Sequence, residues 1–221
     1  MEDIAVRHEV VYGVNTGFGL LANTRISDAD LSRLQINIVR SHAAGLGNYL
    51  EDRAVRLIMV LKINSLARGY SGVGYHVLDT LLDFLNRELY PCIPEKGSVG
   101  ASGDLAPLAH LSSALLGEGM VRKDGQERPA GEVLKDHGLR PLELGPKEGL
   151  ALLNGTQAST ALALDALFRT EELFNSALVI GAMSVDAAKG TDAAFDPRIH
   201  KVRGHPGQNE CAELYRKLLE E

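Results

Sequence analysis

The sequence predicts a mainly α-helical protein, with a helical N-terminal domain over residues 1–150 and the start of a long helix bundle over residues 151–221. Three observations support this fold class. Alanine and leucine, which have high helix propensity, are abundant, while aromatic residues make up only 5% of the chain. Apolar residues recur at helical spacing in several segments. The segment from Gln157 to Lys189 contains no proline and a single glycine, which predicts one helix of bundle length.

Glycine and proline divide the N-terminal domain into short elements. N-cap residues precede the first helical pattern, and two prolines end the third helix. The elements expected in order are a strand-like run over Ile4–Tyr12, a helix from the Ser27–Asp30 cap to Gly45, a mostly apolar helix over Glu51–Arg68, and an amphipathic helix over Tyr75–Tyr90 that stops before Pro91 and Pro94.

The rest of the chain continues in the same way. A helix with a proline near its start is followed by a β-hairpin around Asp124-Gly125. The expected elements are a helix over Leu105–Gly117, a small hairpin over Met120–Glu127, a short helix over Glu132–His137, a loop over Gly145–Thr156, the long helix, a loop over Ala193–Gln208, and an amphipathic helix over Cys211–Leu219.

Composition excludes several classes of function. The net charge of -6 comes from mixed acidic and basic residues without a basic block, so nucleic-acid binding is not expected. No segment predicts a secretory signal or a membrane span. The seven histidines and two cysteines form no metal-ligand pair, so no metal site is expected. Cys92 and Cys211 are too few for a disulfide framework, which favours a reducing cytoplasm.

The most informative segment is the glycine-rich run Gly100-Ala101-Ser102-Gly103-Asp104. A plain structural turn is one interpretation. A hydrolase nucleophile elbow is another, but that motif requires glycine where this chain has Asp104. The third interpretation is cyclisation. The amide nitrogen of Gly103 attacks the carbonyl carbon of Ala101, and Ser102 loses its hydroxyl group as water. Glycine suits such an attack because it reaches backbone angles that other residues avoid.

Five motifs in order identify the chain as a member of a family. The run GSVGASGDLAPLAH, from Gly97 to His110, closely resembles the signature of the aromatic amino acid ammonia-lyases. Four further motifs resemble those of the same family: YGVNTGFG at Tyr12–Gly19, SHAAGLG at Ser41–Gly47, KINSLARGYSG at Lys62–Gly72 and GLALLNGTQAS at Gly149–Ser159. The resemblance covers nearly the whole chain and is nearest to the histidine-specific members. It implies the ammonia-lyase fold.

The resemblance also implies the electrophile. Ala101, Ser102 and Gly103 correspond to the tripeptide that forms 4-methylidene-imidazol-5-one, so no soluble cofactor is expected. Asp104 would support ring formation. Tyr12 corresponds to the family tyrosine that removes a β-proton from the substrate, although an ordinary tyrosine pKa of about 10 makes it a poor base without a helping neighbour. Without the resemblance, Tyr12 is a half-buried aromatic beside a glycine turn.

Two residues are implied to bind the substrate. His42 corresponds to a histidine near the substrate side chain, and the pair His42-Ala43 fits a histidine enzyme better than a tyrosine or phenylalanine enzyme, which remain alternatives. Asn154 corresponds to an asparagine beside the electrophile and the substrate amino group. Taken alone, His42 is a satisfied residue at a helix end and Asn154 is a helix N-cap.

The implied reaction eliminates ammonia from L-histidine and gives trans-urocanate. The family enzymes are tetramers and continue into long helices that supply a Gln/Tyr/Arg cluster, an aromatic residue and a glutamate. Because those motifs are absent here, we expect an incomplete chain with little or no lyase activity alone. Normal turnover would contradict this expectation. The alternatives are a remnant or subunit that needs a complementing C-terminal chain, and a binding module that kept only the fold.

Overall fold

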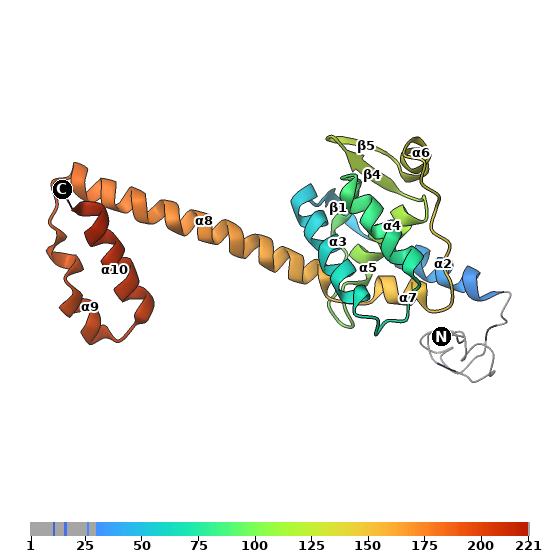
Figure 1. Cartoon of the computed structure of the whole chain (residues 1–221), viewed down its shortest axis with the longest axis horizontal. Helices are drawn as coiled ribbons and strands as arrows, with labels where there is room; N and C mark the ends of the chain where they lie inside the picture. Colours follow the sequence, from blue (N-terminus) through green and yellow to red (C-terminus); the bar gives the residue numbers. More distant parts are fainter. Residues whose placement is uncertain (1–10, 12–15, 17–25, 27–29, 221) are drawn as a thin grey trace. The chain divides into compact units, whose positions relative to one another are not determined.

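The computed structural model describes Val11, Thr16, Ile26 and residues 30–220. Tyr12 and most of the strand-like run expected before it lie outside the described residues. The chain divides into two compact units, Met1–Ala163 and Leu164–Glu221, and the boundary falls within helix α8 (Gln157–Ala187). The mainly helical fold class is confirmed (Figure 1).

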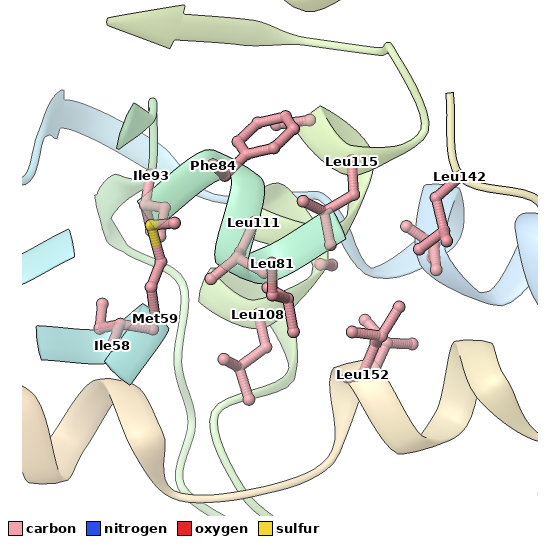
Figure 2. Close-up of a cluster of buried hydrophobic side chains, with 14 of the residues drawn as sticks. Ile58, Met59, Leu81, Phe84, Ile93, Leu108, Leu111, Leu115, Leu142 and Leu152 are labelled. Carbon is pink, nitrogen blue, oxygen red and sulfur yellow. The ribbon is translucent and has the colours of Figure 1, made fainter. Parts of the chain in front are cut away.

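The first unit is built around helix α5 (Leu105–Leu115), which packs against α2 (Leu31–His42) and α7 (Glu148–Leu153). Eight of the eleven residues of α5 are buried. Its apolar residues meet those of α3 (Asp52–Ala67) and α4 (Tyr75–Asn86) in one core cluster. Figure 2 shows Leu108, Leu111 and Leu115 of α5 among these side chains. Each such burial contributes about 1.5–3 kcal/mol, so the core holds α5 firmly in place.

The helices expected from the sequence are present with shifts at their ends. Helix α4 ends at Asn86 rather than at Tyr90, because Glu88 adopts a positive φ of 55° that a helix cannot contain. Helix α2 begins after Asp30, whose side chain makes an ion pair with Arg33 rather than a capping hydrogen bond.

The hairpin is confirmed as β4 (Met120–Lys123) and β5 (Gln126–Pro129), joined by Asp124 and Gly125, both at positive φ. The expectation of a single hairpin was too simple. Strand β2 (Tyr90–Pro91) pairs with β4, and β1 (Leu46–Tyr49) pairs with β3 (Pro94–Lys96) in a second sheet. These strands are too short to show alternation, so only their distant partners define them.

The segment Gly145–Thr156 leads into α8 as expected, but the expectation that it is all loop is wrong, because it contains α7. Its glycines suggested a break in structure. Gly149 instead allows α7 to approach α2 closely, since a methyl group there would lie 2.6 Å from the Gln35 backbone oxygen. The glycine therefore marks a packing contact between α7 and α2.

Helix α6 (Ala130–Asp136) packs against α5 in the same unit.

In the second unit, the loop expected over Ala193–Gln208 is also wrong. It contains a 3₁₀ turn (Asp192–Phe195), helix α9 (Pro197–Arg203) and the start of α10 (Pro206–Leu219). Pro197 and Pro206 occupy first-turn positions, where proline is tolerated. Asp196 caps α9 by accepting from the Arg198 amide at 2.8 Å. The Phe195 and Tyr215 rings then stack at 4.6 Å.

Among the described residues, no helix combines the length and apolar character that a membrane span needs.

Candidate active site

The loop from Gly97 to Asp104 connects strand β3 to helix α5 and contains the Ala101-Ser102-Gly103 tripeptide. Ala101 and Ser102 are exposed and Gly103 is half-buried. Gly100 and Gly103 adopt φ values of 63° and 107°, in the region that favours glycine. Glycine at positions 100 and 103 thus permits a bend that most other residues would not adopt without strain.

Gly103 lies against the turn between α7 and α8. A methyl group at Gly103 would lie 2.6 Å from the carbonyl oxygen and 2.9 Å from the amide nitrogen of Gly155. It would also lie 3.2 Å from Oδ1 of Asn154. Only glycine fits this approach, and the contact joins two motifs that are far apart in the sequence.

Asp104 secures the loop to the same turn. Its side chain is 2% exposed, and Oδ1 accepts a hydrogen bond from Ser98 Oγ at 2.7 Å. Oδ2 accepts from the amide nitrogen and hydroxyl of Ser159 in α8, at 2.7 and 2.9 Å. The Asp104 amide donates to Gly155 O at 2.7 Å. One buried residue therefore holds both ends of the 98–104 segment and the start of α8.

The segment after α2 approaches the loop from another side. A methyl group at Gly97 would lie 3.0 Å from the Gly45 Cα atom. The Gly45 amide donates to Nε2 of His110 in α5 at 3.0 Å. Burial lowers the pKa of His110, which favours the neutral ring that can accept this bond. Gly45, three residues after His42, is thereby held beside the 97–104 loop.

His42 is the last residue of α2 and is half-buried. Its Nδ1 atom lies 2.8 Å from the Ile38 carbonyl oxygen, which can only accept, so Nδ1 carries a proton. Nε2 is then the acceptor of the neutral imidazole. His42 is thus satisfied at a helix end, and it retains one ring nitrogen for a ligand.

Asn154 follows α7 as its C-cap, with extended backbone angles and an exposed side chain. Helix α8 begins only at Gln157, so the interpretation of Asn154 as a helix N-cap is wrong. Its side-chain oxygen instead lies close to Gly103.

Sequence reasoning missed Lys62, which is 1% exposed in α3. Its Nζ atom donates to the carbonyl oxygens of Ala151 at 2.7 Å and Asn154 at 2.9 Å. Burial lowers the pKa of Lys62 to about 7. The available signals were a lysine within a mostly apolar helix and its place at the start of the KINSLARGYSG motif, and neither predicted a role for its side chain.

The structure thus gathers five of the predicted residues at one place. Ala101, Ser102 and Gly103 lie in the loop, Asp104 anchors it, and Asn154 flanks it. His42 ends α2, three residues before Gly45, which packs on Gly97. The position of Tyr12 lies outside the described residues. Asp104 holds this loop in place, and the backbone of Gly155 lies close to Gly103. This arrangement fits a tripeptide that must be bent for ring closure.

Comparison with known proteins shows which family the chain resembles. A family model described as aromatic amino acid lyase matches residues 1–221. The histidine ammonia-lyase of Vibrio vulnificus strain YJ016 is 60% identical over 220 residues, which are 100% of this chain and 43% of the relative. That of Aliivibrio fischeri strain ES114 is 63% identical over 96% of this chain and 41% of the relative.

Solved structures of similar fold include an ammonia-lyase and an aminomutase. Histidine ammonia-lyase from Trypanosoma cruzi superposes with a TM-score of 0.91 at 39% identity, over 97% of this chain and 42% of that one. Pantoea agglomerans phenylalanine aminomutase gives a TM-score of 0.90 at 35% identity, over 98% and 42%. The chain therefore spans about two fifths of the length of the proteins that it matches.

Proposed function

This chain belongs to the aromatic amino acid lyase family, and from that premise we propose that it forms the electrophile-bearing part of a histidine ammonia-lyase. The proposed reaction eliminates ammonia from L-histidine and gives trans-urocanate. The names of the curated relatives support histidine as the substrate class.

The observation that carries the proposal is the approach of Gly103 to Gly155, together with the hydrogen bonds of Asp104. Ring closure forms a bond between the Gly103 nitrogen and the Ala101 carbonyl carbon, and the carbonyl oxygen leaves as water with the amide protons of Gly103 and Ser102. Ser102 then loses its hydroxyl group and its α-proton as a second water. A loop bent at Gly103 and held at Asp104 supports this step, because restricting the backbone reduces the entropy cost of bringing reacting atoms together.

Each predicted residue has a role in this proposal. When formed, the 4-methylidene-imidazol-5-one supplies an electrophilic carbon, and no soluble cofactor is needed. Asn154 positions the amino end of the substrate beside Gly103. His42 accepts a hydrogen bond from the substrate side chain through Nε2. Tyr12 removes the β-proton.

We also propose that the protein acts in the cytoplasm as a homotetramer or with a complementing chain. Cys92 and Cys211 are free thiols, which suits a reducing compartment. Helix α8 carries apolar side chains that are largely exposed, among them Leu173, Ile180 and Met183. Exposed apolar side chains along a helix favour association with further helices.

Intact mass spectrometry of the purified chain tests the proposed ring. We expect a mass lower than that calculated from the sequence by roughly 36 Da, because ring formation removes two waters from the chain. Ser102→Ala is the control, because it has no hydroxyl group to lose as the second water and cannot show the full loss of two waters. An unmodified wild-type chain would contradict ring formation in this chain.

The substrate is tested separately. The chain, alone and with a C-terminal portion of a relative, is supplied with L-histidine, L-tyrosine or L-phenylalanine, and each unsaturated product is followed by its absorbance. If urocanate is the only one of the three products released, the result supports the histidine assignment. Preferential release of the tyrosine or phenylalanine product would contradict it.

A further inference from the structure

Lys62 is a buried lysine whose two hydrogen-bond partners among the described residues are both backbone carbonyls. It lies in α3, is 1% exposed, and donates to the oxygens of Ala151 and Asn154. Both acceptors belong to the C-terminal end of α7 and the residue that follows it. Burying an ammonium group is costly, and a methionine would fill similar space without that cost. This placement therefore calls for a function beyond packing.

The contacts lead from Lys62 to the tripeptide in three steps. The carbonyl oxygen of Asn154, which Lys62 holds at 2.9 Å, belongs to the same planar peptide unit as the amide nitrogen of Gly155. That nitrogen would lie 2.9 Å from a methyl group at Gly103. The carbonyl oxygen of Gly155 accepts from the Asp104 amide at 2.7 Å. Lys62 thus holds the Asn154–Gly155 peptide, whose nitrogen faces Gly103, and the Gly155 carbonyl that meets Gly103 and Asp104 begins the next peptide along the chain.

We propose that Lys62 is a positioning residue for ring formation, which holds the Asn154–Gly155 peptide so that it presses the Ala101-Ser102-Gly103 segment into the bent conformation that cyclises. This inference rests on the proposed function and extends it to a residue outside the tripeptide. Lys62 acts through backbone groups, and the α7 end is its point of contact.

The first test measures the position of the loop without ring chemistry. In a Ser102→Ala background, which cannot dehydrate, amide hydrogen exchange is followed at Asp104, whose amide donates to Gly155. Lys62→Met should accelerate exchange at this amide about tenfold, since both hydrogen bonds from Lys62 to the end of α7 are lost. Lys62→Gln, which keeps one donor group, should give a smaller acceleration and serves if the methionine variant unfolds.

The matched control is Leu66→Ala, one turn further along α3 and 2% exposed. It removes a core side chain and lowers the midpoint of unfolding, but it leaves the carbonyls of α7 in contact with Lys62. We expect Asp104 exchange to stay near the Ser102→Ala value. Equal acceleration in Leu66→Ala and Lys62→Met would overturn the proposal, because a general loss of stability would then explain both.

The second test uses intact mass with Ser102 present. The Lys62→Met chain should remain largely unmodified under conditions in which wild type and Leu66→Ala lose both waters. Complete modification of Lys62→Met would also overturn the proposal. An unmodified wild-type chain would count against the ring, whereas the exchange comparison would still decide whether Lys62 positions the loop.

Discussion

At the scale of single residues, Gly103 is the position where one added atom matters most. Its φ of 107° is strained for any other residue, and a methyl group would meet the backbone of Gly155 at 2.6 Å. We expect Gly103→Ala to lower the free energy of unfolding by about 1–3 kcal/mol. It should also abolish the mass loss attributed to ring formation. Retention of both properties in urea titration and mass spectrometry would show that the close contact is unimportant.

Asp104 offers a second test at this scale. Its carboxyl group accepts three hydrogen bonds in a buried position, two of them from Ser159. Asp104→Ala leaves these donors unpaired, so we expect a loss of about 2–4 kcal/mol in the free energy of unfolding. Asp104→Asn keeps one acceptor oxygen and should lose less. The order is checked by chemical denaturation, and equal stability of all three chains would refute the anchoring role.

Lys62 makes stability depend on pH in a direction opposite to that of most paired lysines. Burial lowers its pKa from 10.5 to about 7, so between these values the unfolded chain binds a proton that the folded chain does not. The free energy of unfolding therefore rises with pH over this window, because the unfolded state holds more protons. Below pH 7 both states are protonated, and the full cost of burying the charge is present.

We expect the wild-type chain to gain about 2 kcal/mol relative to Lys62→Met on going from neutral pH to about pH 9. The two chains are compared by urea unfolding at each pH, so that other titrating groups cancel. A difference between the chains that is independent of pH would mean that Lys62 keeps an ordinary pKa.

At the scale of elements, short helix α7 depends on a glycine for its place in the fold. A methyl group at Gly149 would lie 2.6 Å from the Gln35 oxygen of α2. Although alanine has better helix propensity, we expect Gly149→Ala to destabilise the chain by about 1–3 kcal/mol through overpacking. The measurement is the midpoint of thermal unfolding.

Gly207 in α10 provides the opposite case. Apart from the adjoining residues and the backbone of α10 itself, no described atom lies within 4 Å of the position that a methyl group would occupy there. Gly207→Ala should therefore stabilise the chain by about 0.5–1 kcal/mol, as propensity alone predicts. If both substitutions changed stability in the same direction, the α2–α7 contact would not be the reason for Gly149.

At the scale of the whole molecule, the exposed apolar side chains of the second unit lead to a prediction about association. Leu173 is 72% exposed and Ile180 is 61% exposed on α8. We expect the chain to associate in sedimentation velocity runs, and the double substitution Leu173→Glu and Ile180→Lys to shift it toward smaller species. A wild-type chain that sediments as a monomer at every concentration would contradict the proposed assembly.

The sequence predicted the long elements well for identifiable reasons. Helix α8 follows from an uninterrupted run without proline, and the hairpin follows from Asp124-Gly125 between short strands. The predicted loops were wrong where glycine or proline residues, which often end a helix, had another structural role. Gly149 lies inside a helix because a neighbouring helix passes closely, and Pro197 and Pro206 begin helices rather than prevent them.

The sequence alone also determined the tripeptide and its family, since the five motifs occur in order along the chain. Only the tertiary structure decided how these motifs meet. Gly103, Asp104 and Gly155 come together because α5 and α7 pack on one core, and Lys62 reaches the same place from α3. Such contacts depend on distances between segments far apart in the chain. Local residue patterns record backbone preference and apolar spacing, but they carry no information about which distant carbonyl a buried lysine will meet.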